Sequence, residues 1–160
     1  MPVQIDDPYA VPGDYRKAQL HCHTTASDGR LSPPELLRRY KDAGYAFVVI
    51  TDHNRVTRCD ALNDDRFLAL PGAEDTVSYL LPPLGPHLGR LFVEAPTRRG
   101  TAQERIDATT RAGGLASLCH PTWTGNLWTG TWTLRAATTL RGYRLIEIWN
   151  PHSRPERDLA

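Results

Sequence analysis

The segment FVVITDHN, residues 47–54, is the most informative part of the sequence, because an apolar run passes directly into a polar cluster. A short, continuous apolar run of this kind is typical of a buried strand. Asp52 and His53 then fall at the carboxyl end of that strand. In parallel α/β proteins, this end of the strands carries the active site. The segment therefore predicts an α/β fold with functional side chains at one rim of a sheet.

The same alternation continues in both directions along the chain. Candidate strands cover residues 18–23, 46–53, 67–74, 87–94, 114–120 and 145–150. One helix is predicted to begin at Ser32, with Glu35 as its capping-box partner, and to end at Gly44. A second helix is predicted between Thr101 and Gly113. Strands alternating with helices predict an α/β layout with largely parallel strands.

Length and charge limit the class of protein. The chain has 160 residues and a formal net charge of +1, and 40% of its residues are hydrophobic. These values are typical of one globular domain, and a balanced charge gives no field that would attract nucleic acid or anionic lipid. No apolar run is long enough to span a bilayer or to act as a signal peptide. We expect a cytoplasmic protein without nucleic-acid or membrane partners; the sequence does not indicate its oligomeric state.

Histidines and carboxylates recur at the ends of the predicted strands. His21 and His23 should project from one face of the first strand, and Cys22 from the other. Such a pair alone is more often ordinary surface histidine than a pair of metal ligands. The recurrence of histidines and carboxylates at the ends of successive strands favours a metal site. The further candidate ligands are Asp28, His53, Glu74 and His120.

Imidazole nitrogen and carboxylate oxygen together suit divalent ions such as Zn²⁺, Mn²⁺ or Fe²⁺, and a bridging carboxylate can hold two ions close together. The competing option is thiolate ligation by Cys22 or Cys119, which is disfavoured because both should face away from the adjacent histidines. With Cys59, these cysteines show no paired spacing, which fits reduced thiols. No GxSxG, P-loop or GxGxxG motif is present.

A segment between residues 122 and 133 carries Trp123, Trp128 and Trp132 among threonines and glycines. A loop of this composition could form an aromatic wall over a pocket. The tryptophans could equally pack into an ordinary core. The sequence leaves both interpretations open.

The motifs LHCHTTASDG, GYAFVVITDHN, PGAE, PHLGRLFV, CHP and IEIWN resemble, in order and spacing, the PHP (polymerase and histidinol phosphatase) superfamily of metallohydrolases. The endings TDHN and EIWN are similar to its CehA/McbA-type branch, which is named for a carbaryl hydrolase. The resemblance covers residues 17–150. It implies a partial, distorted (β/α)7 barrel with a metal site at the C-terminal ends of its strands.

The resemblance also implies roles for individual residues. Glu74 is expected to bridge two metal ions, and Asp28 and His120 are the expected catalytic residues. Asp52 and Glu147 are expected to support the site or the fold. The full set of implied metal ligands is His21, His23, Asp28, His53, Glu74, His87 and His120.

The sequence departs from the family pattern at its C-terminus. Family members close the metal site with a late Asp-x-His motif, whereas this chain ends in NPHSRPERDLA. Neither His152 nor Asp158 has the required spacing. A barrel of this type also needs about 200 or more residues to close. We therefore expect one PHP domain over residues 1–160, incomplete at its C-terminus.

Together these features predict a metal-dependent hydrolase that activates water on two or three ions. The expected substrate is a small-molecule phosphoester, or a carboxylic or carbamate ester. The alternative is a non-catalytic remnant that binds metal or acts as an interaction module. A PHP module of a DNA polymerase or proofreading enzyme is disfavoured by the neutral charge.

Overall fold

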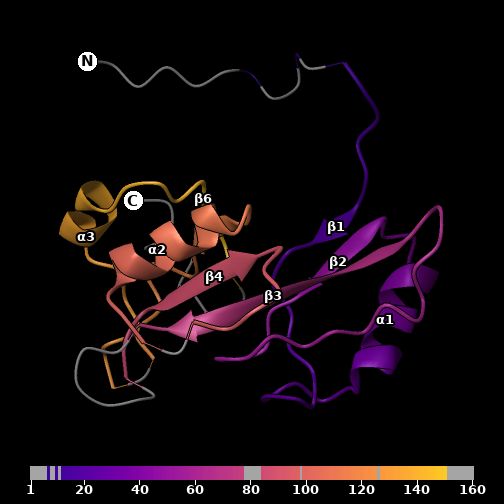
Figure 1. Cartoon of the computed structure of the whole chain (residues 1–160), viewed down its shortest axis with the longest axis horizontal. Coiled ribbons are helices and arrows are strands. Elements are labelled where there is room, and N and C mark those ends of the chain that lie inside the picture. Colours follow the sequence, from indigo (N-terminus) through magenta and orange to yellow (C-terminus); the bar gives the residue numbers. More distant parts are fainter. Residues whose placement is uncertain are drawn as a thin grey trace.

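The computed structural model describes residues 7, 10, 12–77, 84–97, 99–125 and 127–150. His152 and Asp158 lie outside this part of the chain. The described residues form six strands and three helices, which do not alternate strictly (Figure 1). The elements are β1 (Ala18–Gln19), α1 (Pro33–Asp42), β2 (Phe47–Ile50), β3 (Leu68–Thr76), β4 (His87–Leu91), α2 (Ala102–Arg111), β5 (Leu115–Leu118), α3 (Leu134–Thr139) and β6 (Leu145–Ile146).

All the strands belong to one curled, six-stranded sheet whose spatial order follows the sequence, β1-β2-β3-β4-β5-β6. β1, β2 and β3 pair in parallel, and so do β5 and β6. The expectation of a largely parallel sheet is wrong at β4, which runs antiparallel to both β3 and β5. Only a short connection joins β3 to β4, and a parallel pairing would need a longer crossover.

The reversal of β4 places its first residue at the same rim as the carboxyl end of β3. His87 is paired with Thr76 across these strands, and Gly89 with Glu74. A side chain at the amino end of β4 can therefore join side chains that follow the parallel strands.

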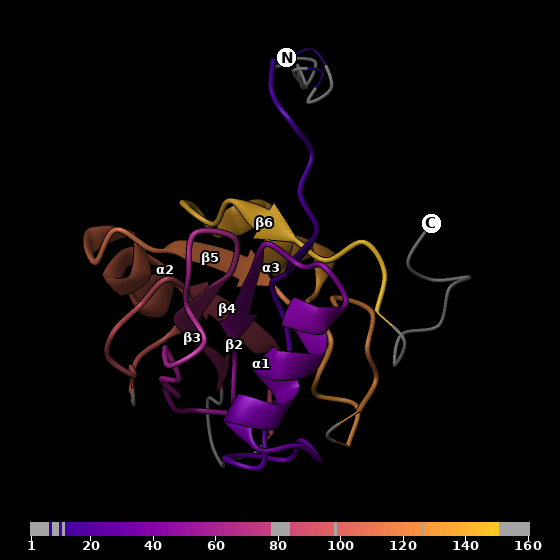
Figure 2. The ribbon, with the colours of Figure 1, turned by 90° about the vertical axis from the view of Figure 1, so that its right-hand side faces the viewer.

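Two hydrophobic clusters stabilise the sheet. In one, Leu37 of α1 packs with Val48, Ile50 and Phe67. In the other, Ile106 of α2 packs with residues of β4 and β5. Figure 2 shows α1 in front of the sheet and α2 beside β4 and β5. Leu37 is fully buried, and burying such a side chain contributes about 1.5–3 kcal/mol.

Both predicted helices are confirmed, together with their capping boxes. In α1, Glu35 accepts a hydrogen bond from the Ser32 backbone N–H at 3.1 Å. In α2, Thr101 and Glu104 form the same reciprocal pair. The short helix α3 was not predicted. Within the described ranges, no helix combines the length and the apolar character that a membrane crossing requires.

The predicted strands are all present, but most are shorter than expected. β1 ends at Gln19, so His21 and His23 lie just beyond it rather than on it. β3 instead continues to Thr76, so Glu74 lies inside the strand rather than at its end. His53 follows β2 and forms an isolated bridge with Glu74, which brings the two residues together.

Candidate metal centre

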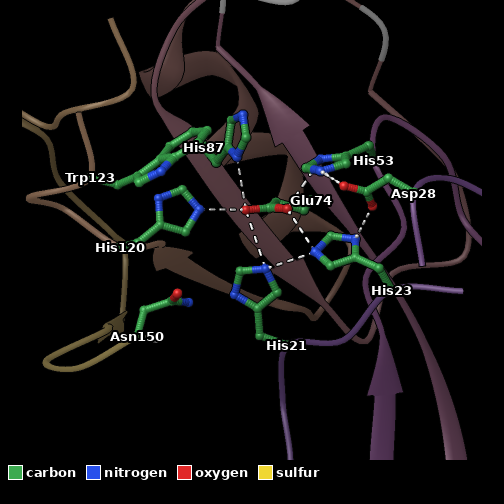
Figure 3. Close-up of a pocket in the computed structure, with 9 residues that line it drawn as sticks. All are labelled: His21, His23, Asp28, His53, Glu74, His87, His120, Trp123 and Asn150. Atoms are coloured by element: carbon green, nitrogen blue, oxygen red, sulfur yellow. Dashed lines mark hydrogen bonds and ion pairs between the residues drawn. The ribbon is translucent and has the colours of Figure 1, made fainter. Parts of the chain in front are cut away.

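The side chain of Glu74 lies at the centre of a cluster of histidines (Figure 3). It is only 1% exposed. Its Oε1 atom lies 2.9 Å from His120 Nε2, 3.0 Å from His87 Nδ1 and 3.3 Å from His21 Nε2. One carboxylate oxygen therefore faces imidazole nitrogens from three separate segments.

The other oxygen of Glu74 faces a second set of histidines. Its Oε2 atom lies 3.1 Å from His53 Nδ1 and 3.2 Å from His23 Nε2. Asp28 lies on the far side of these rings, with Oδ1 3.5 Å from His23 Nδ1 and Oδ2 3.4 Å from His53 Nε2. The Asp28 side chain is 65% exposed, so it lies at the open end of the cluster.

All seven predicted ligands line one cavity of about 370 Å³, which Trp123 and Asn150 complete among the described residues. Histidines that follow β1, β2 and β5 reach it from the carboxyl ends of those strands. His87 reaches it from the amino end of β4. His87 and Glu74 thus lie within strands, whereas the resemblance implied a metal site at the C-terminal ends of the strands. The roles of the seven residues as ligands stay a prediction.

A divalent cation needs several nitrogen or oxygen donor atoms close together, and two groups of residues offer them. His21, Glu74 and His120 present donor atoms within 4.8 Å of one another, and so do His23, His53 and Glu74. Buried ring nitrogens of His23, His53 and His120 make no hydrogen bond. In His53 this nitrogen is 3.1 Å from Glu74 without hydrogen-bond geometry. Buried polar atoms are normally paired, and neutral imidazole lone pairs beside a carboxylate suit a metal ion.

The pKa of Glu74 agrees with an ionised bridging group. Burial alone would raise this pKa, but hydrogen bonds from the surrounding imidazoles, led by His120, hold it well below its ordinary value. Burial lowers the pKa of His53, which favours its neutral form. Metal ligation requires these two forms, a carboxylate and a neutral imidazole.

Glu147 holds two of the histidines from outside the cavity. Its Oε1 atom lies 2.5 Å from His21 Nδ1, and its Oε2 atom accepts a 2.6 Å hydrogen bond from the His120 backbone N–H. His120 has a φ of 28°, a conformation that costs a non-glycine residue of the order of 1–3 kcal/mol. A carboxylate on Nδ1 holds a proton there and directs Nε2 of His21 towards Glu74. Burial would lower the pKa of His21, but its hydrogen bonds with Cys119, Glu147 and Glu74 raise it, so a metal ion would have to displace the proton on Nε2. The expected supporting role of Glu147 has this geometric basis.

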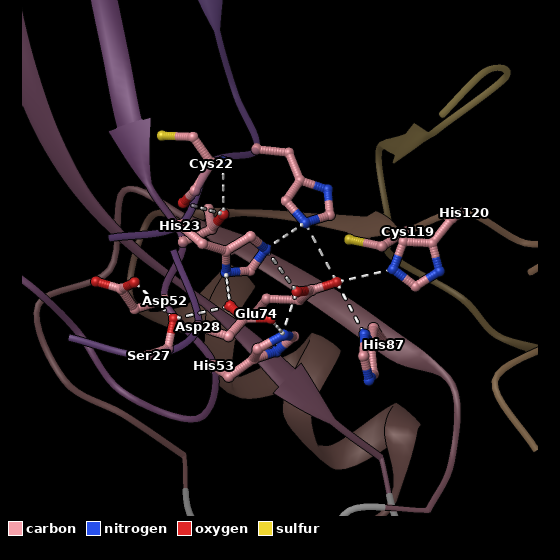
Figure 4. A network of polar contacts seen from close by, with 12 residues as sticks. Cys22, His23, Ser27, Asp28, Asp52, His53, Glu74, His87, Cys119 and His120 are labelled. Carbon is pink, nitrogen blue, oxygen red and sulfur yellow. Dashed lines mark hydrogen bonds and ion pairs between the residues drawn. The ribbon is translucent and has the colours of Figure 1, made fainter. Parts of the chain in front are cut away.

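Asp52 supports the loop that carries Asp28. It is fully buried and accepts hydrogen bonds of 2.7 Å from the Thr24 backbone N–H, the Thr24 hydroxyl and the Ser27 hydroxyl. Figure 4 shows Asp52 and Ser27 beside Asp28. Burial would raise the pKa of Asp52, but hydrogen bonds from Thr57, Thr24 and Ser27 lower it. Its oxygens are thus engaged in holding the loop.

Comparisons with known proteins bear on the fold. No family model matches the chain. A crystal structure from Bifidobacterium adolescentis, of a protein assigned as a metal-dependent phosphoesterase, superposes with a TM-score of 0.66 at 14% identity over 91% of this chain and 82% of the other. The chain shares its fold. A second crystal structure, from Bacteroides vulgatus, is of a two-domain protein that contains a metal-dependent phosphoesterase assigned as PHP-like. It superposes with a TM-score of 0.53 at 16% identity, over 77% of this chain and 40% of the other.

A curated relative adds a short sequence match. The chain is 44% identical over 45 residues to a 5′-3′ exoribonuclease of Haemophilus influenzae. The match spans 28% of this chain and 16% of the exoribonuclease. The shared fold therefore covers most of the chain, whereas the sequence match to a curated relative covers only a part of it.

Sequence reasoning missed one neighbour of the site. Cys22 points away as expected, with Sγ donating to Val49 O at 3.3 Å. Cys119, however, lies with His21 and Glu147 in a group whose donor atoms are within 4.8 Å of one another. Because successive side chains point to opposite faces of a strand, Cys119 points away from the adjacent His120. It points instead towards His21, which belongs to a different segment. Burial raises the pKa of Cys119 to about 12, so the thiol stays protonated at neutral pH.

The tryptophans of the 122–133 segment have different environments, so neither interpretation holds for all of them. Trp132 is 5% exposed, belongs to the core beneath α2 and donates from Nε1 to His87 O at 3.0 Å. Trp128 is 77% exposed. Trp123 borders the cavity beside His87. Trp123 thus fits the interpretation of an aromatic wall, whereas Trp132 fits that of ordinary core packing.

Proposed function

We propose that this chain is a metal-dependent phosphoesterase of the PHP superfamily, in which Glu74 and the histidines on its two sides would hold the divalent cations. The observation that carries the proposal is the division of the histidines around this carboxylate. Oε1 faces His21, His87 and His120. Oε2 faces His23 and His53. A carboxylate placed between two imidazole sets suits a bridge between two ions.

The chain's own residues would prepare the site before any substrate arrives. Glu74 is held ionised by its hydrogen bonds, and Glu147 fixes the proton of His21 on Nδ1. Asp28 lies exposed at the open end, where it can accept a proton from an attacking water. His120, whose Nε2 faces Glu74 at the end of the cavity away from Asp28, would act on the leaving oxygen through the cation that it helps to hold. Bound Zn²⁺, Mn²⁺ or Fe²⁺ would polarise the phosphoryl group and lower the pKa of the attacking water.

The phosphoester class is favoured over carboxylic or carbamate esters. Both solved structures that share the fold are assigned as phosphoesterases, and an exoribonuclease, by its name, cleaves phosphodiesters. The resemblance to the CehA/McbA-type branch keeps carboxylic and carbamate esters as the second substrate class. We propose a small-molecule substrate, a cytoplasmic location and no nucleic-acid or membrane partner, in line with the net charge of +1.

The test compares ester classes under controlled metal supply. The purified chain is assayed with p-nitrophenyl phosphate, bis-p-nitrophenyl phosphate and p-nitrophenyl acetate, after chelation and after return of Mn²⁺ or Zn²⁺. We expect phosphoester hydrolysis that depends on metal and that is lost in Glu74→Gln, a variant of the same shape. Activity that survives exhaustive chelation contradicts the metal mechanism. Metal-dependent cleavage of the acetate ester alone contradicts the phosphoester class, and tight metal binding without any hydrolysis favours the non-catalytic alternative.

A further inference from the structure

The cavity has an aromatic wall that the metal chemistry does not require. Of the described residues that line it, seven are candidate ligands and the others are Trp123 and Asn150. Trp123 is the one with an extended apolar surface. A volume of about 370 Å³ lies within the range of small-molecule sites.

The loop around Trp123 is built to hold the indole in one place. A Cβ added to Gly125 would overlap the indole ring, and one at Gly130 would lie 2.6 Å from its Cε3 atom. The backbone of both glycines therefore lies directly against the ring, and a larger residue at either position would displace it. The Gly130 N–H donates to Gly125 O at 3.1 Å, and the Thr131 hydroxyl donates to Trp123 O at 2.9 Å. These bonds close the loop and fix its position.

The neighbouring histidines meet the indole at an angle and do not stack on it. The His87 ring lies 5.2 Å from the Trp123 ring between centroids at an interplanar angle of 49°, and the His120 ring lies 4.9 Å away at 75°. Figure 3 shows the indole beside these two rings, at the end of the cavity away from Asp28. Neither imidazole stacks on the indole, and Trp123 lines the cavity, so a planar group can contact the ring from the cavity side.

We propose that the substrate of this centre carries a planar aromatic group that stacks on Trp123 while its phosphoester lies at Glu74. The inference rests on the proposed phosphoesterase function and names its substrate class. An aryl phosphate and a nucleotide would both supply such a group, because every nucleobase has a planar π-face. Trp123 thus selects among phosphoesters that the ions alone would not distinguish.

The test uses phosphonates, which cannot be hydrolysed, so that binding is measured apart from catalysis. Dissociation constants of phenylphosphonate and cyclohexylphosphonate are measured by calorimetry with the Mn²⁺-loaded chain. These ligands share a charged group and a six-carbon ring, but only one ring is planar. A second pair, the phosphonate analogues of adenosine 5′-monophosphate and ribose 5-phosphate, is measured with the same Mn²⁺-loaded chain and shows whether the planar group is a nucleobase.

We expect the wild type to bind phenylphosphonate roughly two- to tenfold more tightly than cyclohexylphosphonate. If a base is the natural planar group, the nucleotide ligand should bind at least about fivefold more tightly than the sugar ligand. Trp123→Leu should abolish the preference, whereas Trp128→Leu, which alters an exposed tryptophan of the same loop, should keep it. Trp123→Phe should retain part of the preference for planar ligands, and it replaces the leucine variant in the test if that variant does not fold.

Two results would overturn the inference alone. One is a wild type without any preference for the planar ligands. The other is a Trp123→Leu variant that weakens both phosphonates equally and loses bound metal, because the indole would then only support His87 and His120. Failure of every phosphonate to bind the metal-loaded chain would instead overturn the phosphoesterase proposal and the inference with it.

Discussion

Glu147→Gln tests how the outer carboxylate controls the metal centre. Glu147 accepts from His21 Nδ1 at 2.5 Å and from the His120 backbone N–H at 2.6 Å. A glutamine of the same shape offers one acceptor and one donor. If its carbonyl faces His120, its NH₂ group donates to Nδ1 of His21, which moves the imidazole proton to Nε2, the atom that faces Glu74. If the glutamine carbonyl instead faces His21, the NH₂ group faces the His120 backbone N–H, so two donors meet and neither has an acceptor.

Either orientation removes one charge-assisted hydrogen bond, which contributes about 1.5–3 kcal/mol. At 1.4 kcal/mol per factor of ten, the expected loss of metal affinity is roughly 10–100-fold, which agrees with the usual effect of removing such a support. The affinity is measured for Mn²⁺ by competition with a fluorescent chelator. Glu104→Gln is the matched control, because Glu104 also accepts from a backbone N–H, at 2.7 Å, but lies on α2 outside the cavity. Equal metal affinity in wild type and Glu147→Gln would refute the reasoning.

Other variants separate the fold from the site. Asp52→Asn should lower the free energy of unfolding in urea by roughly 1–3 kcal/mol, because the amide keeps one acceptor oxygen for the Thr24 N–H and the Ser27 hydroxyl but turns an NH₂ donor towards the Thr24 hydroxyl; an unchanged midpoint would contradict this. Leu37→Ala, at a fully buried position, should cost about 2–5 kcal/mol in the same assay, and a loss below about 1 kcal/mol would show that α1 is not packed as described. His23→Ala should reduce the Mn²⁺ bound per chain while leaving stability without metal nearly unchanged, and full metal content would argue against ligation at Oε2.

Most residues that line the cavity could be predicted from the sequence because their placement depends on local patterns. Histidines placed directly after short apolar runs, as at His53 and His120, must lie near a sheet rim wherever the strands pair. Capping boxes likewise depend only on residues three positions apart, so both long helices were predicted correctly. The convergence of these side chains on Glu74 follows from the pairing of neighbouring strands.

The direction of β4 and the partners of Glu147 could not be predicted in the same way. The predicted strand 67–74 left residues 75–86 for a crossover to β4, whereas β3 continues to Thr76 and leaves a connection too short for parallel pairing. Glu147 reaches His21 across 126 positions of sequence. The separate environments of Trp123, Trp128 and Trp132 likewise depend on how one glycine-rich loop closes.

The most direct test of the account is the number of divalent ions bound to each chain, measured by inductively coupled plasma mass spectrometry after dialysis against Mn²⁺ or Zn²⁺. Glu74 should bridge two ions, so we predict at least two per wild-type chain, and at most one in Glu74→Gln because neither histidine set retains its shared carboxylate. One ion or none in the wild type, or the same number in wild type and Glu74→Gln, would contradict the central claim that Glu74 joins two metal sites.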